Sequence, residues 1–190
     1  MLARFKYTRR SRMKLRTIAA AALFAAMGAS AQAYTFNGDT TGGPTYNRPF
    51  TLLSLSGVGT AVHYAAFTFS VDMSGSYTFN TTTAEYDPFI ALHSPSFDPT
   101  AGLTNLLALN DDFAGSFSES QFTTALSAGT AYVLINTGYG NADFGAFTTT
   151  ITGPGNVVAV PEPATWGLMA LGMLGVSAAA ARRRKQALAA

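Results

Sequence analysis

Residues 61–81 of the chain read AVHYAAFTFSVDMSGSYTFNT. Apolar and polar side chains alternate over residues 61–71, which is the pattern of a half-buried β-strand. The turn-forming residues Asp72-Met73-Ser74-Gly75 follow, and the alternation resumes over residues 76–81. The spacing predicts that this second strand returns as the hairpin partner of the first.

The same short, alternating pattern continues through the middle of the chain. Further strands are predicted at Phe89–His93, Leu106–Asn110, Ser120–Leu126, Tyr132–Asn136 and Ala146–Thr152, with weaker candidates at Tyr34–Phe36 and Thr51–Leu55. No segment between Tyr34 and Val160 has a helical period, and the density of Thr, Phe and Tyr favours strands. The prediction is an all-β fold, a single antiparallel β-sandwich of jelly-roll type over residues 34–159.

Residues 1–33 have the features of a signal peptide. The first sixteen residues carry seven basic side chains and no acid, and an apolar run from Ile18 to Ala29 follows. The small residues Ala31 and Ala33 stand where signal peptidase requires them, so the mature chain is predicted to begin at Tyr34. Translation can start at Met1 or at Met13, which begins a shorter signal of the ordinary kind. We therefore expect export through the inner membrane.

The basic residues lie almost entirely at the two ends of the chain. The whole chain has a formal net charge of +2, but residues 34–160 contain nine acids and one base, Arg48, which gives this segment a net charge of −8. A nucleic-acid partner is excluded because no basic patch is present, whereas an acidic surface suits divalent cations. The chain has no cysteine, which excludes disulfides, zinc–thiolate sites and a thiol nucleophile.

The C-terminal segment, residues 160–190, has three parts in a fixed order. Val160-Pro161-Glu162-Pro163 comes first, then an uncharged run from Ala164 to Ala181, then Arg182-Arg183-Arg184-Lys185. As a helix, the eighteen-residue run would be about 27 Å long, close to the roughly 30 Å of a bilayer core. A transmembrane helix is predicted at 164–181, with the basic cluster on the cytoplasmic side and the preceding domain outside.

This tail resembles the PEP-CTERM sorting signal, which is found on exported proteins of Gram-negative bacteria that make extracellular polysaccharide. The resemblance implies a partner, the membrane-embedded transpeptidase exosortase, which would cleave at or near residues 160–163 and either release or re-anchor the domain. The two prolines hold the motif extended, as a protease cleft requires. The alternative is a plain C-terminal membrane anchor with a chance Pro-Glu-Pro.

The middle of the chain, roughly residues 60–152, resembles bacterial pre-peptidase C-terminal domains. The resemblance rests on four segments in order, at residues 86–92, 105–112, 126–135 and 145–148. It implies a small β-sandwich that serves as an accessory module and is not catalytic. Some members of that family bind calcium or a polymeric matrix.

Asp111 and Asp112, preceded by Asn110, form the sharpest polar cluster. Oxygen ligands suit calcium, and Asp87 is the predicted third ligand, with Asp143 as a further candidate if the loops converge. The alternative is a loop in which these side chains bond their own backbone. Glu85 and Asp87 would share a face on a strand and resemble a glycosidase carboxylate pair, but Pro88 indicates a loop. The two histidines, His63 and His93, show no partner spacing for a metal site or a triad.

Two functions follow. The first is a non-enzymatic surface or extracellular-matrix protein whose sandwich is structural or associates with polysaccharide, with calcium as the candidate cofactor. Rings in glycine-rich loops would then stack on sugars; the candidates are Tyr46, Phe113, Phe117, Tyr139 and Phe144. The alternative is a secreted hydrolase that acts on polysaccharide through Glu85, Asp87 or Asp111.

Overall fold

The computed structural model describes residues 31–160, and every regular element in this range is a β-strand. The strands are β1 (Gln32–Asp39), β2 (Thr45–Tyr46), β3 (Pro49–Thr51), β4 (Ser54–Leu55), β5 (Val62–Val71), β6 (Gly75–Thr83), β7 (Pro88–His93), β8 (Leu106–Asn110), β9 (Glu119–Leu126), β10 (Tyr132–Gly138), β11 (Ala146–Gly153) and β12 (Val157–Ala159). Residues 31–160 contain no helix with the length and apolar character needed to cross a membrane. The predicted signal helix and transmembrane helix lie outside the described residues and stay predictions.

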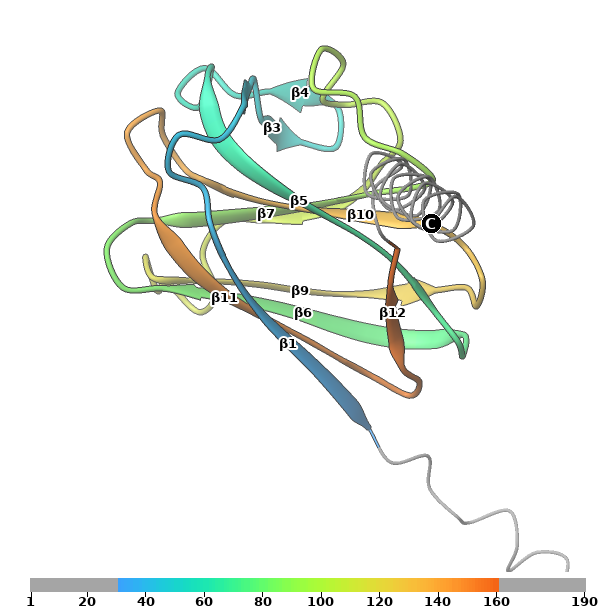
Figure 1. Ribbon diagram of the computed structural model, residues 1–190. Helices are drawn as coiled ribbons and strands as arrows, with labels where there is room; N and C mark the ends of the chain where they lie inside the picture. Colours follow the sequence, from blue (N-terminus) through green and yellow to red (C-terminus); the bar gives the residue numbers. More distant parts are fainter. Residues whose placement is uncertain (1–30, 161–190) are drawn as a thin grey trace, which may run out of the picture. The chain divides into compact units, whose positions relative to one another are not determined.

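Ten of the strands form two antiparallel sheets that pack face to face (Figure 1), and β3 and β4 pair as a separate two-stranded sheet. One sheet has the order β1-β11-β6-β9, and the other has the order β12-β5-β10-β7-β8, with β2 also paired to β5. Apart from the four shortest strands, successive strands alternate between the sheets, except that β7 and β8 are hydrogen-bonded neighbours in the larger sheet; this is the arrangement of an eight-stranded jelly roll. The predicted antiparallel β-sandwich is confirmed for these residues.

The predicted hairpin between residues 61–71 and 76–81 is wrong. Both strands exist, but β5 pairs with β10 while β6 pairs with β11 and β9 in the opposite sheet. The two strands meet through their inner faces instead, where the rings of Phe69 and Phe79 lie 5.9 Å apart in the buried core. The turn that joins them is held by Asp72, whose carboxylate accepts hydrogen bonds from the backbone and side-chain nitrogens of Asn156.

A third layer covers the outer face of the larger sheet. Figure 1 shows β3 and β4 on the side of β5, β7 and β10 that faces away from the smaller sheet. A second apolar cluster lies beneath this layer; its buried members are Tyr46, Val62, Phe89, Ala91, Val133 and Ile135. The segment that connects β7 to β8 closes the layer, with the ring of Phe97 5.2 Å from that of Tyr46. Because both faces are covered, β7 and β10 are buried along their whole length.

Two sequence predictions fail in this layer. Residues 51–55 were predicted as one strand but contribute to the two short strands β3 and β4. Tyr46 was predicted to expose its ring in a loop but is only 3% exposed. In both places the chain folds back over a sheet face that the local pattern does not reveal. The strands β2 and β12 were not predicted because two or three residues are too few to show an alternation.

Candidate functional site

The three predicted calcium ligands lie together at one end of the sandwich. Asp87 directly precedes β7, and Asp111 and Asp112 directly follow β8. These strands are antiparallel neighbours, with Ile90 opposite Asn110, so the start of one lies beside the end of the other. One carboxylate oxygen from each aspartate falls within a group whose members are all within 4.8 Å of one another. We call this group the aspartate triad.

The carboxylates of the triad repel one another and are partly buried, and both effects disfavour their ionised forms. Burial and the charges of Asp111, Asp112 and Asp143 raise the pKa of Asp87 to about 6. Burial also raises the pKa of Asp111, an effect that the nearby charge of Arg48 opposes. One oxygen of each triad carboxylate is buried without a hydrogen-bond partner. Unpartnered buried acceptors are costly, so the triad is an arrangement that a cation would stabilise.

The dimensions of the triad fit a calcium ion. Calcium binds oxygen at about 2.3–2.6 Å, so two ligands on opposite sides of one ion lie up to about 5 Å apart. A single ion can therefore contact all three carboxylates at the observed separation. The alternative, a loop capped by its own aspartate side chains, is less consistent with the unpartnered oxygens of Asp111 and Asp112. Calcium binding itself stays a prediction.

Asn110, Asp143 and Glu85 do not belong to the triad. The side-chain oxygen of Asn110 accepts a hydrogen bond from the backbone of Gln121, and the carboxylate of Asp143 accepts one from the backbone of Gly140. Glu85 is exposed in the connection between β6 and β7. The prediction that Pro88 marks a loop-to-strand junction is confirmed, because β7 begins there.

Arg48 is the residue near the triad that sequence reasoning missed. It is only 1% exposed, and its guanidinium lies 4.2 Å from the ring centre of Phe89 and 4.6 Å from that of Tyr139. Its Nε donates to the carbonyl of Tyr139 at 2.7 Å, and its Nη1 donates to the carbonyl of Pro49 at 3.0 Å. The available signal was that Arg48 is the single Lys or Arg between residues 34 and 160. With this charge nearby, three ionised aspartates leave two net negative charges for a divalent ion to neutralise.

Aromatic rings are exposed beside the triad. Phe113 and Phe117 lie in the loop that follows Asp112, with 38% and 71% of their surface exposed. Phe144 follows Asp143 in the chain and is 40% exposed, and its ring lies edge-on 5.2 Å from that of His63. Tyr139 is half-buried because its ring packs on Arg48. Three of the five predicted sugar-stacking rings are therefore available to a ligand at this end of the sandwich.

Neither histidine belongs to the aspartate triad. His63 donates from Nδ1 to the carbonyl of Gly43 at 2.6 Å, and His93 donates from Nδ1 to that of Thr104 at 3.1 Å. Burial lowers the pKa of His93, which is fully buried. Each side chain therefore makes one hydrogen bond to the backbone, and the Nε2 of His93 is buried without a hydrogen-bond partner among the described residues.

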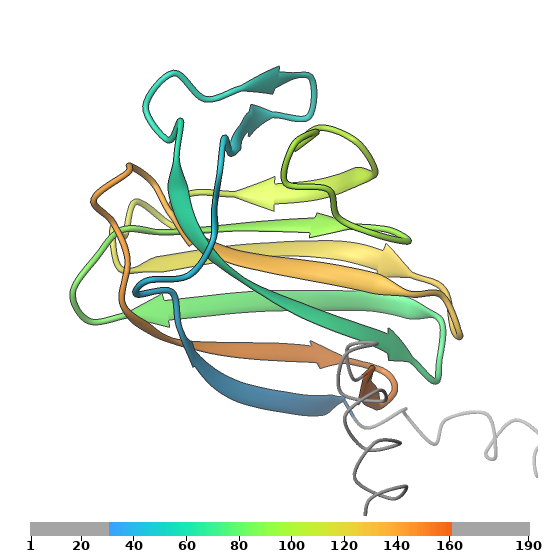
Figure 2. The same cartoon turned by 45° about the horizontal axis from the view of Figure 1, so that its top comes forward.

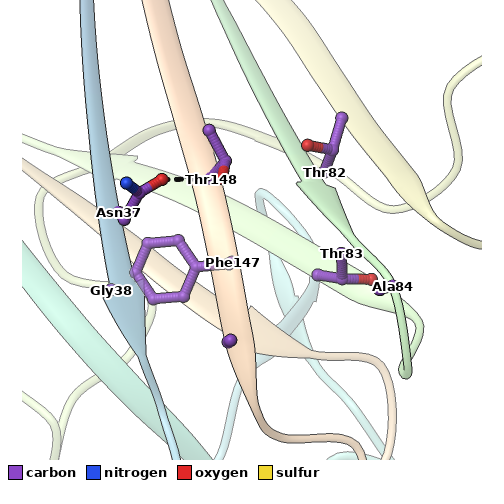
Figure 3. Close-up of a pocket in the computed structure, with 8 residues that line it drawn as sticks. Asn37, Gly38, Thr82, Thr83, Ala84, Phe147 and Thr148 are labelled. Atoms are coloured by element: carbon purple, nitrogen blue, oxygen red, sulfur yellow. Dashed lines mark hydrogen bonds between the residues drawn. The ribbon is translucent and has the colours of Figure 1, made fainter.

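A hollow of about 410 Å³ opens at one end of the smaller sheet (Figure 3). Its lining consists of Asn37, Gly38, Thr82, Thr83, Ala84, Ala146, Phe147 and Thr148. The ring of Phe147 packs on Gly38, where any larger side chain would overlap it, and the Thr148 hydroxyl donates to Asn37 at 2.8 Å. None of the lining side chains ionises near neutral pH, so this hollow offers hydrogen-bonding groups but no acid or base.

The described range ends at the first residue of the predicted sorting motif. Val160 follows β12, and its backbone nitrogen donates to the carbonyl of Thr68 at 2.9 Å. Pro161, Glu162, Pro163 and the basic cluster Arg182–Lys185 lie outside the described residues. The predicted signal-peptidase residues Ala31 and Ala33 lie at the start of β1, so cleavage after Ala33 would remove the first two residues of that strand. These processing sites stay predictions.

Comparison with known proteins gives one sequence match and several structural ones. No curated relative matches the chain. The chain is similar in structure to the pre-peptidase C-terminal domain of a Bacillus anthracis collagenase, at 14% identity and a TM-score of 0.40 over 62% of this chain and 87% of that one. It is also similar to PliG, a periplasmic inhibitor of g-type lysozyme from Aeromonas hydrophila, at 13% identity and a TM-score of 0.39 over 67% and 89%. The model for the PEP-CTERM protein-sorting motif matches residues 159–185, so the chain carries this motif directly after its β-sandwich.

Proposed function

We propose that this chain is an exported surface or extracellular-matrix protein, sorted by an exosortase and carrying a non-catalytic β-sandwich that associates with polysaccharide. The observation that carries the proposal is the PEP-CTERM match at residues 159–185, which begins where β12 ends. The protein would cross the inner membrane, remain anchored by residues 164–181, and then reach the cell surface or the extracellular space after cleavage near residues 160–163.

Polysaccharide would bind at the end of the sandwich that carries the aspartate triad. A bound calcium ion would offer open coordination positions to sugar oxygens, and Phe113, Phe117 and Phe144 would stack on the apolar faces of the rings. The support is the combination of unpartnered carboxylate oxygens with exposed aromatic rings in the same and adjoining loops.

Calcium should raise the melting temperature of the mature protein, residues 34–160. At a free concentration a hundred times the dissociation constant, binding adds about 2.7 kcal/mol, which corresponds to a rise of several degrees for a domain of this size. Asp111→Asn should abolish the rise, whereas Asp98→Asn, in another loop, should preserve it. The rise should shrink below about pH 6, because protons then compete with calcium for Asp87. An unchanged melting temperature in millimolar calcium at pH 7 would contradict the site.

The mature protein should also bind the polysaccharide of its producing cells, and a chelator should weaken the binding. Phe117→Ala removes a ring that is 71% exposed, so it should reduce binding about tenfold or more without unfolding the domain. Leu53→Ala, which truncates an exposed side chain away from the triad, is the matched control. Depolymerisation of the polysaccharide that is lost in Asp111→Ala would instead establish the hydrolase alternative.

A further inference from the structure

The hairpin formed by β3 and β4 exposes an unusual number of apolar side chains. We call residues 49–58, which read PFTLLSLSGV, the apolar hairpin; the segment carries no charge. Five of its side chains are exposed: Phe50 by 62%, Leu52 by 52%, Leu53 by 90%, Leu55 by 44% and Val58 by 54%. Figure 2 shows the hairpin standing clear of the two main sheets. Five exposed apolar side chains within one segment of ten residues indicate an interaction site.

The framework beneath the hairpin holds these side chains outward. The backbone nitrogen of Arg48 donates to the carbonyl of Gly59 at 3.0 Å, and that of Ser56 donates to the carbonyl of Arg48 at 2.8 Å. At the tip, the hydroxyls of Thr51 and Ser54 lie 2.7 Å apart. The base is therefore fixed to the buried Arg48, so collapse of the apolar side chains onto the sandwich would require these bonds to break.

The chemistry of the hairpin favours a lipid surface as its occupant. Four of the five exposed side chains are aliphatic, and aliphatic groups partition into hydrocarbon but do not provide the flat rings on which sugars stack. A second copy of the chain would bring two domains of net charge −8 together, whereas the hairpin itself carries no charge that an anionic lipid surface would repel. Strands of two or three residues are also too short to add firmly to the sheet edge of another protein.

The exit point of the chain places the bilayer within reach of the hairpin. β12 runs antiparallel to β5, with Ala159 opposite Phe69, so at Val160 the chain is heading toward the Val62 end of β5. At that end Val62 pairs with Tyr46, close in sequence to the hairpin. The distance along β5 from Thr68 to His63 is about 17 Å. From Val160, four residues spanning at most about 14 Å lead to the apolar run at Ala164.

We infer that the apolar hairpin inserts its leucines into the outer surface of the inner membrane while the chain is still anchored there. This inference rests on the proposed function, in which residues 164–181 enter the bilayer. The short tether gives the hairpin a high effective concentration at the membrane, so weak insertion suffices. Two attachment points fix the orientation of the sandwich, and they hold residues 160–163 at the membrane surface, where a membrane-embedded protease can reach them.

The absence of cysteine from the chain permits a direct test. Leu53→Cys places a single environment-sensitive fluorophore at the tip, and Ala125→Cys places one on the exposed outer face of the smaller sheet as the matched control. The full chain is reconstituted into vesicles of phosphatidylethanolamine and phosphatidylglycerol. The label at residue 53 should shift its emission to the blue and be quenched by brominated lipid tails, whereas the label at residue 125 should do neither.

Flotation of the same vesicles distinguishes membrane anchoring by residues 164–181 from insertion of the apolar hairpin. If the full chain does not float with the vesicles, the proposed anchoring is wrong and the inference fails with it. If the chain floats but the label at residue 53 keeps its water-like emission, the inference is overturned and the anchoring stands. If the emission shifts to the blue, brominated lipid does not quench it and cross-linked dimers form, then a second copy of the chain covers the hairpin, and the inference is also overturned.

The double variant Leu52→Ser/Leu53→Ser should slow cleavage near residues 160–163 several-fold.

Discussion

Alanine at Pro161, Glu162 and Pro163 should leave the protein in the inner membrane with Arg182–Lys185 still attached. The prolines prevent the predicted helix at 164–181 from extending upstream, because proline lacks the backbone N–H of a helix interior and disfavours helical backbone in the residue before it. Alanine has the highest helix propensity and would let the helix continue through the motif. A protease cleft that binds extended backbone would then have no segment to grip, so we expect the cleaved form to fall at least tenfold.

Mass spectrometry of the C-terminus checks this prediction in cells that encode an exosortase. Wild-type protein recovered from the surface or medium should end at or near residues 160–163, and the triple variant should retain the whole tail. Val158→Ala, a change at an exposed position just before the motif, should be processed normally. An intact tail on wild-type protein at the cell surface would show that the segment is a plain membrane anchor.

The sequence predicted the strands well because their alternation is local. The strands β7, β8 and β11 were placed to within a residue or two, since each is bounded by turn residues. The pairing of the strands could not be predicted in the same way, because it joins segments that are far apart in the chain. The alternation of residues 61–71 is equally compatible with a hairpin and with a turn that carries the chain from one sheet to the other. The structure has the turn between sheets, in which Phe69 packs against Phe79 in the core.

The candidate site was predictable in its members but not in its environment. The polar cluster at residues 110–112 pointed to Asp111 and Asp112, with Asp87 as the third ligand, and antiparallel pairing of β7 with β8 brings these three aspartates together. The sequence did not reveal that Tyr46 would be buried or that Arg48 would lie beside the triad. Both depend on residues 44–58 folding over the outer face of the larger sheet, a contact between segments far apart in the chain.

Arg48→Met should lower the free energy of unfolding by about 3–5 kcal/mol. The change leaves the carbonyls of Tyr139 and Pro49 without their charged donor and removes the cation–π contacts with two rings. It also removes the positive charge that opposes repulsion within the aspartate triad. Calorimetry of the mature protein should show a fall in melting temperature of about 10 °C or more. Arg48→Lys keeps the charge but loses the planar fork, so its loss should be intermediate.

A second substitution separates the electrostatic part of this loss from the packing part. The pKa of Asp87 is raised from 3.8 to about 6, so the folded state binds more protons than the unfolded state in that interval. Stability is therefore lost as the pH rises through about 6, and Asp87→Asn should be neutral or stabilising at pH 7.

In the Arg48→Met background, Asp87→Asn should recover more stability than it does in wild type, because the repulsion among the triad carboxylates is larger when Arg48 does not oppose it. Calcium should likewise stabilise Arg48→Met more than wild type. Additive effects of the two substitutions would show that Arg48 holds the third layer by packing alone and has no electrostatic role at the triad.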